Sequence, residues 1–211
     1  MQRSKSSVSE DENMQIKRDD CKIFQEVHVT YVLNEGGGML MSLWYVMQVR
    51  AGTEENARCQ CLRLISSNIL EHCFVPYYQQ KKRFQGEWHI QETVLFPGYV
   101  FLVTSDLKQL MDSLRKVTGM IRLLRTGEQI VPLSGEEVDL LLKLGREEQL
   151  VRMSTGVIEN AYVKVFDGPL KGMEDCIKKI DRHKRKAHIA IEMFGRSMDV
   201  EIGLEIISKI K

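Results

Sequence analysis

The sequence lacks the features that mark several common protein classes. None of its apolar runs reaches the roughly 18 residues without charge that a membrane-spanning helix requires. Its five cysteines are odd in number and include no CxxC pair, which argues against a disulfide scaffold and against a zinc ribbon. No signal sequence with a basic start and an apolar centre opens the chain. We therefore expect a cytoplasmic protein with no membrane contact.

Motifs of the common enzyme classes are also missing. The five histidines form no HExxH or similar metal-binding spacing. The sequence contains no GxSxG, Walker or GxGxxG pattern. Pairs of acidic residues such as Glu136 and Glu137 come at the starts of expected helices, where the helix dipole favours negative charge. The sequence thus predicts no enzymatic activity, no cofactor and no metal.

Positive charge is unevenly distributed along the chain. The 211 residues include 30 Lys and Arg against 29 Asp and Glu, and 43% are apolar, enough for folded cores. Residues 1–40 carry a net charge of −2, residues 41–150 a net charge of 0, and residues 151–211 a net charge of +3. The segment Lys178–Lys186 holds six basic residues and one acid. A near-neutral total therefore conceals a local basic stripe.

The first 42 residues differ in composition from the rest. Met1–Asp20 is rich in Ser, Asp, Glu and Lys without a period, so it buries too little apolar surface to offset the entropy of ordering. Gly36, Gly37 and Gly38 precede Met39, a pattern that also fits a ribosome-binding site translated from a start assigned too far upstream. A disordered extension and a misassigned start both stay open. In either case we expect no folded structure before about Ser42.

Residues 43–145 show a mixed pattern of strands and helices. The strongest strand signals are Leu43–Val49 and Tyr99–Thr104, and a hairpin over 79–89 turns at Gln85–Glu87. Helical spacing follows Thr53, covers 107–114 and follows Ser134, and Thr53 and Ser134 are expected caps. This order predicts an α/β sandwich with a mainly antiparallel sheet.

A polar stretch over residues 146–156 is an expected linker. From residue 157 to 211 apolar residues alternate with polar ones, and turn signals occur at Asp167–Pro169, Phe194–Gly195 and Gly203. Short strands joined by tight turns predict a small β-barrel of about 50 residues. The chain is therefore expected to be an α+β protein of two domains.

Four motifs together resemble a known family. WYV at 44–46 and FPGYVF at 96–101 lie in the first domain, and VKVFDGPLKG at 163–172 and MFGRSMDVE at 193–201 lie in the second. This order and spacing resemble the NusG family of transcription elongation factors, whose NGN and KOW domains would correspond to residues 43–145 and 157–211. GPLKG, RHKRK and the closing GLEII are similar to the LoaP antiterminator group within that family. An ordinary NusG is the alternative.

The resemblance implies that the first domain binds the clamp helices of bacterial RNA polymerase through an apolar surface. The matching aromatic positions are Trp44, Phe96, Tyr99 and Phe101. For Trp44 and Phe96 a simple core position is the favoured interpretation. For Tyr99 and Phe101, which share one face of a strand, core and contact are evenly balanced.

The hairpin over 79–89 offers a second candidate surface. Lys81, Lys82 and Arg83 would touch upstream DNA beside the polymerase, although a solvated hairpin is the favoured interpretation. In the second domain, Phe194 and Arg196 match the family segment that contacts termination factor Rho or a ribosomal protein of the small subunit. The pattern leaves open which of the two is bound.

The basic stripe is the candidate RNA site. Its residues are Lys178, Lys179, Arg182, His183, Lys184, Arg185 and Lys186. Such a cluster on a loop between two barrel strands suits the phosphates of an RNA hairpin, and a solvated loop is the alternative. We therefore expect a monomeric antitermination factor recruited by leader RNA, or else a general NusG that couples the polymerase to Rho or the ribosome. Pattern alone also leaves open whether the second domain switches its fold.

Overall fold

The structure is a computed structural model that describes residues 31–33, 39–119, 121–160 and 162–210. Most of the expected N-terminal extension lies outside the described residues. Within it, β1 (Tyr31–Leu33) and β2 (Met39–Met41) pair as a short antiparallel hairpin. The sequence predicted no folded structure before Ser42, so this hairpin is a difference from that expectation.

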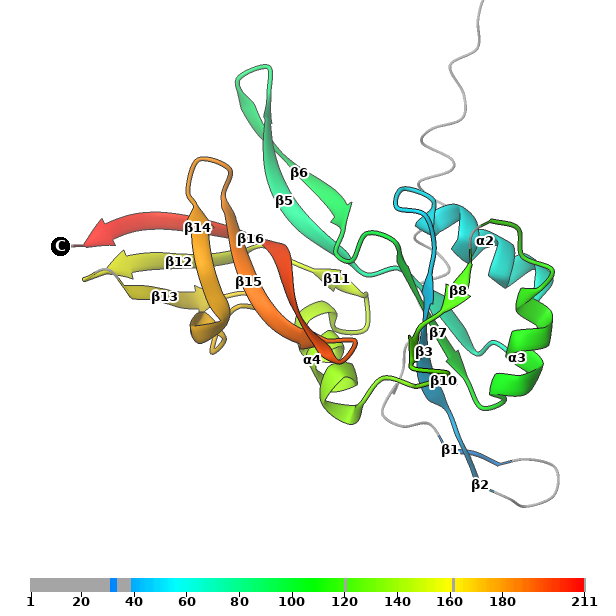
Figure 1. Cartoon of the computed structure of the whole chain (residues 1–211). Coiled ribbons are helices and arrows are strands. Elements are labelled where there is room, and N and C mark those ends of the chain that lie inside the picture. The colour runs from blue at the N-terminus through cyan, green and yellow to red at the C-terminus, as the bar shows by residue number, and fades with distance from the viewer. Residues whose placement is uncertain (1–30, 34–38, 120, 161, 211) are drawn as a thin grey trace, which may run out of the picture.

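The first part of the chain is built on a four-stranded antiparallel sheet in the order β4-β7-β3-β8. Its strands are β3 (Leu43–Gln48), β4 (His72–Phe74), β7 (Tyr99–Thr104) and β8 (Arg122–Leu123). Helices α2 (Glu54–Leu64) and α3 (Leu107–Leu114) lie together on one side of this sheet (Figure 1). The predicted sandwich with an antiparallel sheet is confirmed.

Alternation along the central strands divides the core in two. Tyr45, Met47 and Leu102 pack with residues of α2 and α3 on the helical side. Trp44 and Phe101 point to the opposite side and pack in a second cluster that extends into the C-terminal barrel. The sheet therefore lies between two helices and the barrel, because successive side chains of a strand point to opposite faces.

The helix starts differ in how they are capped. Ser134 caps α4 (Gly135–Gly145) in a capping box, because its hydroxyl accepts from Glu137 N and Glu137 accepts from Ser134 N. Thr53 makes no such contact, and its hydroxyl donates instead to Arg50 O at 2.6 Å. The expected cap is therefore found at Ser134 and not at Thr53.

The predicted hairpin consists of β5 (Tyr77–Phe84) and β6 (Glu87–Val94). Its two turn residues, Gln85 and Gly86, have φ of 49° and 89°. Positive φ at both positions is the geometry that continues the right-handed twist of the paired strands. The hairpin consequently extends far beyond the sheet (Figure 1).

The segment expected to be a linker is attached to this hairpin. After α4, β11 (Leu150–Val151) pairs in parallel with β5, and Tyr77 N donates to Gln149 O at 2.9 Å. The next strand, β12 (Ser154–Glu159), begins inside the expected linker. Short strands β9 (Arg125–Thr126) and β10 (Gln129–Ile130) connect β8 to α4.

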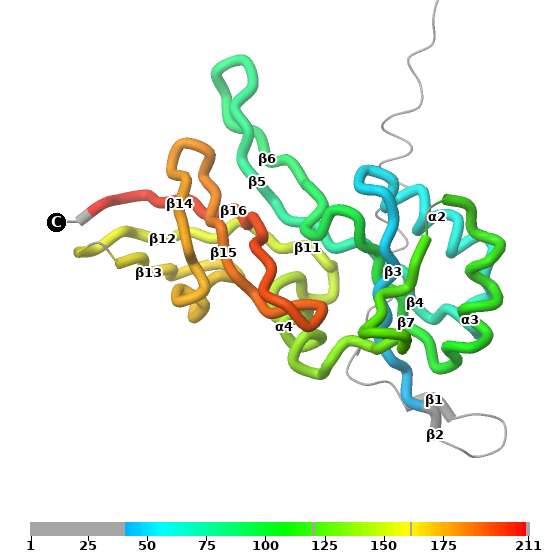
Figure 2. Tube along the Cα trace, in the orientation of Figure 1, coloured from blue at the N-terminus to red at the C-terminus, as the bar shows by residue number. Residues whose placement is uncertain are grey.

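The C-terminal part is a five-stranded β structure in the order β13-β12-β16-β15-β14. Beside β12 it contains β13 (Tyr162–Asp167), the 3-10 turn η1 (Glu174–Cys176), β14 (Ile177–Asp181), β15 (Lys186–Met193) and β16 (Arg196–Ile210). The tube in Figure 2 shows β14 and β15 as one hairpin, with β16 following directly from β15. These curved strands form the expected small barrel.

Gly203 lies inside β16 and not at the turn that the sequence predicted. Up to Gly203 the strand pairs with β15, and from Leu204 onward it pairs with β12. A Cβ at Gly203 would collide with the carbonyl oxygen of Gln79 and with the sulfur of Met153. The glycine is therefore required by close approach of β5 at the point where β16 changes partners.

A candidate docking face covered by the barrel

The aromatic residues singled out from the sequence gather on the barrel side of the sheet. Trp44 packs edge-on against Phe74 with ring centroids 5.2 Å apart, and Phe74 stacks on Phe101 at 5.3 Å. Phe96 lies 5.8 Å from Phe101. Trp44, Phe96 and Phe101 are buried, and only Tyr99 is half-exposed. Trp44 and Phe96 therefore occupy core positions, as the favoured interpretation expected, and Phe101 is also a core residue.

The barrel covers this aromatic face with Phe194 and Arg196. The ring of Phe194 stacks on Tyr99 with a centroid distance of 4.7 Å and an interplanar angle of 22°. It also lies 5.8 Å from Phe96 and 6.0 Å from Phe101. Arg196 Nη2 donates to the Tyr99 hydroxyl at 2.7 Å. The two surfaces expected to contact different partners therefore face and occlude each other.

The turn between β15 and β16 places Phe194 at this contact. Phe194 and Gly195 both have positive φ, 60° and 67°, so the strands reverse in two residues and the Phe194 side chain projects from the tip. Gly195 N donates to Glu137 Oε1 at 3.2 Å. Glu137 therefore serves both the capping box of α4 and the barrel turn, a role that the helix dipole alone does not predict.

A cavity of about 760 Å³ lies beside this contact. It is lined on one side by residues before and within α4, such as Leu133 and Leu140, and on the other by Met193 and Phe194. The space is partly open to solvent, so it marks the edge of the contact between the barrel and the first part of the chain.

Glu54 fixes the turn that precedes Tyr99. Its side chain is buried, and Oε1 accepts from Gly98 N at 2.6 Å and from Gly52 N at 3.0 Å. Gly98 has a φ of 87°, and a Cβ added to it would lie 3.2 Å from Val49 O. The carboxylate thereby joins the start of α2 to the Phe96–Gly98 turn and sets the direction in which Tyr99 leaves it.

Comparison with known proteins identifies the family. The model of the family described as "Transcription termination factor nusG" matches residues 42–142. The chain is 30% identical over 176 residues to the transcription termination/antitermination protein NusG of Halalkalibacterium halodurans, covering 79% of this chain and 98% of that protein. The chain belongs to the NusG family. The NusG protein of Bacillus subtilis is 27% identical over 175 residues, with 79% and 98% coverage.

A solved structure agrees with the fold of this NusG-family chain. It is described as "Domain interaction in Thermotoga maritima NusG", and it covers 78% of this chain and 94% of its own with a TM-score of 0.53 and 22% identity. The family consists of transcription factors, so the prediction that the chain is not an enzyme is confirmed by its membership. Among the described residues, no helix is long and apolar enough to cross a membrane.

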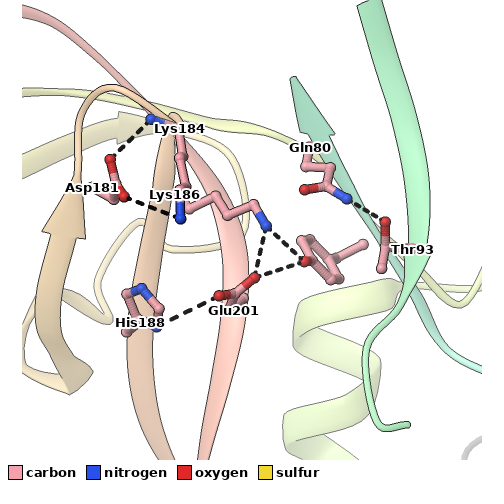
Figure 3. A network of polar contacts seen from close by, with 8 residues as sticks. Gln80, Thr93, Asp181, Lys184, Lys186, His188 and Glu201 are labelled. Carbon is pink, nitrogen blue, oxygen red and sulfur yellow. Dashed lines mark hydrogen bonds and ion pairs between the residues drawn. The ribbon is translucent and has the colours of Figure 1, made fainter. Parts of the chain in front are cut away.

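A second contact between the barrel and the NusG-type first part is polar. The Tyr78 hydroxyl donates to Glu201 Oε2 at 3.1 Å, and Lys186 Nζ donates to the same oxygen at 2.7 Å. Figure 3 shows Lys186 reaching Glu201 between β15 and β16. The Lys186 hydrogen bond lowers the pKa of Glu201, while burial and the nearby carboxylate raise the pKa of Tyr78. Both shifts keep Tyr78 as donor and Glu201 as acceptor.

The basic stripe divides into two groups. The exposed group consists of Lys178, Lys179, Arg182, His183 and Lys184. The second group, Arg185 and Lys186, is half-buried because both side chains contact the first part of the chain. The Arg185 guanidinium lies 3.9 Å from the centroid of the Trp88 ring and 2.8 Å from a Glu205 oxygen. The Asp181 carboxylate accepts from Lys184 N at 2.9 Å and shapes the turn (Figure 3). The stripe runs from β14 through the turn into β15, so only its middle lies on a loop.

The three cations of the β5–β6 hairpin, Lys81, Lys82 and Arg83, differ in their contacts and exposure. Lys81 forms an ion pair with Glu205 of the barrel. Arg83 Nε donates to Gly86 O at 3.1 Å and is exposed, as is Lys82. Only Lys82 and Arg83 are therefore available to an external partner in this arrangement.

Sequence patterns missed the residues that join the two parts. The pattern around them is that of ordinary surface positions, because the partner that each one contacts in the other part of the chain lies more than 50 residues away; these residues are Glu137, Trp88, Glu201 and Glu205. One available signal was the apolar tip of the hairpin, where Phe84, Trp88 and Ile90 occur among charges. In the described part of the chain, no cluster of three or more His, Cys, Asp or Glu residues is arranged to hold a metal ion.

Proposed function

We propose that this NusG-family chain is a transcription elongation and antitermination factor that binds bacterial RNA polymerase through the face around Tyr99. The observation that carries the proposal is the Phe194 contact. The half-buried aromatic ring of Phe194, on a projecting turn, is received by Phe96, Tyr99 and Phe101, so this face accepts an apolar side chain presented by another surface. An amphipathic coiled coil such as the clamp helices would present such side chains.

Polymerase binding through this face requires the barrel to leave. Phe194 stacks on the Tyr99 ring and Arg196 bonds to its hydroxyl, so a second partner cannot use that ring face or that hydroxyl while the barrel is docked. The same movement would expose Phe194 and Arg196 on the barrel. We infer that the two candidate surfaces become available together. The face around Tyr99 would belong to a first, NGN-type domain, and Phe194 with Arg196 to a second, KOW-type domain.

We further propose that leader RNA recruits the protein through the exposed part of the basic stripe, as in the LoaP group. Arg182, His183 and Lys184 lie on one tight turn with their side chains in solvent. Clustered cations on a projecting turn favour phosphate contacts. A general NusG role is the second candidate, and the Phe194–Arg196 pair supports it, since an apolar ring beside a guanidinium is a suitable contact for Rho or a ribosomal protein.

Transcription in vitro through a terminator separates these functions. With purified bacterial RNA polymerase, we expect readthrough to rise only on templates that carry the leader, and Tyr99→Ala to abolish that rise. Phe101→Ala is a poorer probe because Phe101 is fully buried and its loss would leave a cavity. Tyr162→Ala, at an exposed tyrosine of β13, is the matched control and should keep full activity.

Equal readthrough with and without the leader would select the general NusG function. Unchanged readthrough by the Tyr99→Ala variant would contradict the proposed polymerase face.

A further inference from the structure

Two hairpins, one from each part of the chain, project side by side. The β5–β6 and β14–β15 hairpins extend beyond the sheets on the same side of the molecule (Figure 1). Arg185, next to the β14–β15 turn, lies over the ring of Trp88, next to the β5–β6 turn. Glu205 accepts from Lys81 of one hairpin and pairs with Arg185 of the other. These contacts hold the two tips at a defined distance.

Strand register assigns the residues of the β5–β6 hairpin to two faces. Lys81 pairs with Ile90 and Arg83 pairs with Trp88, so these four side chains share one face. That face is directed to the barrel, because Lys81 forms an ion pair with Glu205 and the Arg185 guanidinium lies over the Trp88 ring. The opposite face carries Lys82, Phe84 and His89. The ring centroids of Phe84 and His89 lie 6.4 Å apart.

The face directed to the barrel hairpin combines positive charge with exposed apolar side chains. Residues 81–90 carry a net charge of +2 and residues 178–186 a net charge of +5. The acids near the tips are Glu87 at the first turn, Asp181 within the second, and Glu205 between them. Asp181 is held by the turn and Glu205 by two cations. Ile90 is 60% exposed and Trp88 38%, although both lie between cations.

We propose that the two hairpins together form one RNA-binding surface, with Arg83 on one side and Arg182 and Lys184 on the other. This inference rests on the proposed recruitment by RNA and extends that site onto the first part of the chain. Cations on both sides would contact the phosphates of the two strands of a stem. Trp88 and Ile90 would contact an unpaired nucleotide, which an RNA stem-loop offers and which intact duplex DNA does not.

Trp88 acts in this surface as a positioning residue. Its ring fixes the guanidinium of Arg185, and Glu205 fixes it from a second direction. The preorganised arginine then extends the line of positive charge from the barrel turn toward Arg83. Because the contact crosses between the two parts, the complete surface exists only while the barrel is docked. It would therefore capture the RNA before polymerase binds, and the barrel turn alone would hold the RNA once the barrel leaves.

Fluorescence anisotropy of the full chain tests the inference with three labelled probes: a synthetic RNA stem-loop, the blunt RNA duplex of its stem, and duplex DNA of the same sequence. We expect the unchanged chain to prefer the stem-loop. Arg83→Ala should weaken stem-loop binding by roughly five- to tenfold and lower the slope of log affinity against log salt by about one. Lys82→Ala removes the same charge from the neighbouring position on the other face and should change the affinity by less than about twofold.

Further outcomes separate this inference from the proposed function. If Lys184→Ala weakens binding while Arg83→Ala and Lys82→Ala behave alike, RNA binds the barrel turn alone and the shared surface is wrong. If the unchanged chain binds no probe, RNA recruitment and the shared surface both fall. DNA bound as tightly as the stem-loop would overturn the choice of RNA. Trp88→Ala should weaken binding more in the Arg185-containing chain than in an Arg185→Ala background, because the nucleotide contact is lost in both and the positioning of Arg185 only in the first. Equal losses in both would contradict positioning.

Discussion

Glu54 is a buried acid that stabilises the fold through hydrogen bonds with two backbone N–H groups. Its Oε1 accepts from Gly98 N and Gly52 N, and its side chain is almost fully shielded from water. Buried N–H groups require an acceptor, and a charged acceptor gives the stronger bond. This carboxylate therefore stabilises the turn before Tyr99, although its position in the first turn of α2 suggests only a helix-dipole role.

Replacing Glu54 by Ala would leave both N–H groups without this acceptor. We expect the free energy of unfolding to fall by about 2 kcal/mol, which corresponds to a decrease of about 4–8 °C in Tm for a chain of this size. Differential scanning calorimetry would measure it. Glu136→Ala removes an exposed acid from the first turn of α4 and should change Tm far less. Equal losses in the two variants would show that Glu54 contributes only through the helix dipole.

Individual residues were predictable from the sequence where local pattern decides their position. Trp44 and Phe96 were favoured as core, and both are buried. Ser134 and Glu137 stand at capping-box spacing, and the box is formed. Thr53 also looked like a cap, but Glu54 Oε1 accepts from Gly52 N and the Thr53 hydroxyl bonds to Arg50. Which backbone group a side-chain hydroxyl bonds to is settled by geometry that spacing does not contain.

At the scale of elements, β16 is the strand that joins the barrel to the rest of the chain. It pairs with β15 up to Gly203 and with β12 beyond it, and at that position it passes close to Gln79 of β5. The alternating pattern predicted its strand character correctly. It did not reveal the change of partners, because a glycine at a close approach has the same local signal as a glycine at a turn. The attachment of β11 to β5 escaped prediction for a related reason, since only two residues pair.

Gly203→Ala should separate β5 from β16. The added methyl group meets the backbone oxygen of Gln79, which has little freedom to retreat, so we expect a loss of about 1–3 kcal/mol in unfolding free energy. Urea denaturation followed by fluorescence would measure it. Gly135→Ala is the matched control, because its Cβ would meet no atom within 4 Å. It should be neutral or slightly stabilising, since alanine favours helix. A neutral Gly203→Ala variant would contradict the close approach.

At the scale of the whole molecule, the barrel is docked by contacts of two kinds at two ends. The Phe194 end is aromatic and lies beside a cavity, whereas the Glu201 and Glu205 end is polar and includes the hairpin. Motifs in the sequence predicted both parts and both candidate contact surfaces. They did not predict that Phe194 and Arg196 would cover Tyr99, because nothing local links residues almost one hundred positions apart. Docking is therefore a property of tertiary structure, and it decides which surfaces are accessible.

Removing the aromatic end should shift the molecule toward an undocked state. We expect the double variant Phe194→Ala, Arg196→Ala to show a larger radius of gyration in small-angle scattering and to bind RNA polymerase roughly fivefold tighter or more, because less free energy is spent on releasing the barrel. Tyr162→Ala with Lys164→Ala removes an exposed aromatic ring and a cation from β13 and should leave both measurements unchanged. An expanded double variant with unchanged polymerase affinity would place the polymerase contact away from Tyr99. A compact double variant would show that the polar end holds the barrel by itself, and the shared hairpin surface would then persist without the Phe194 contact.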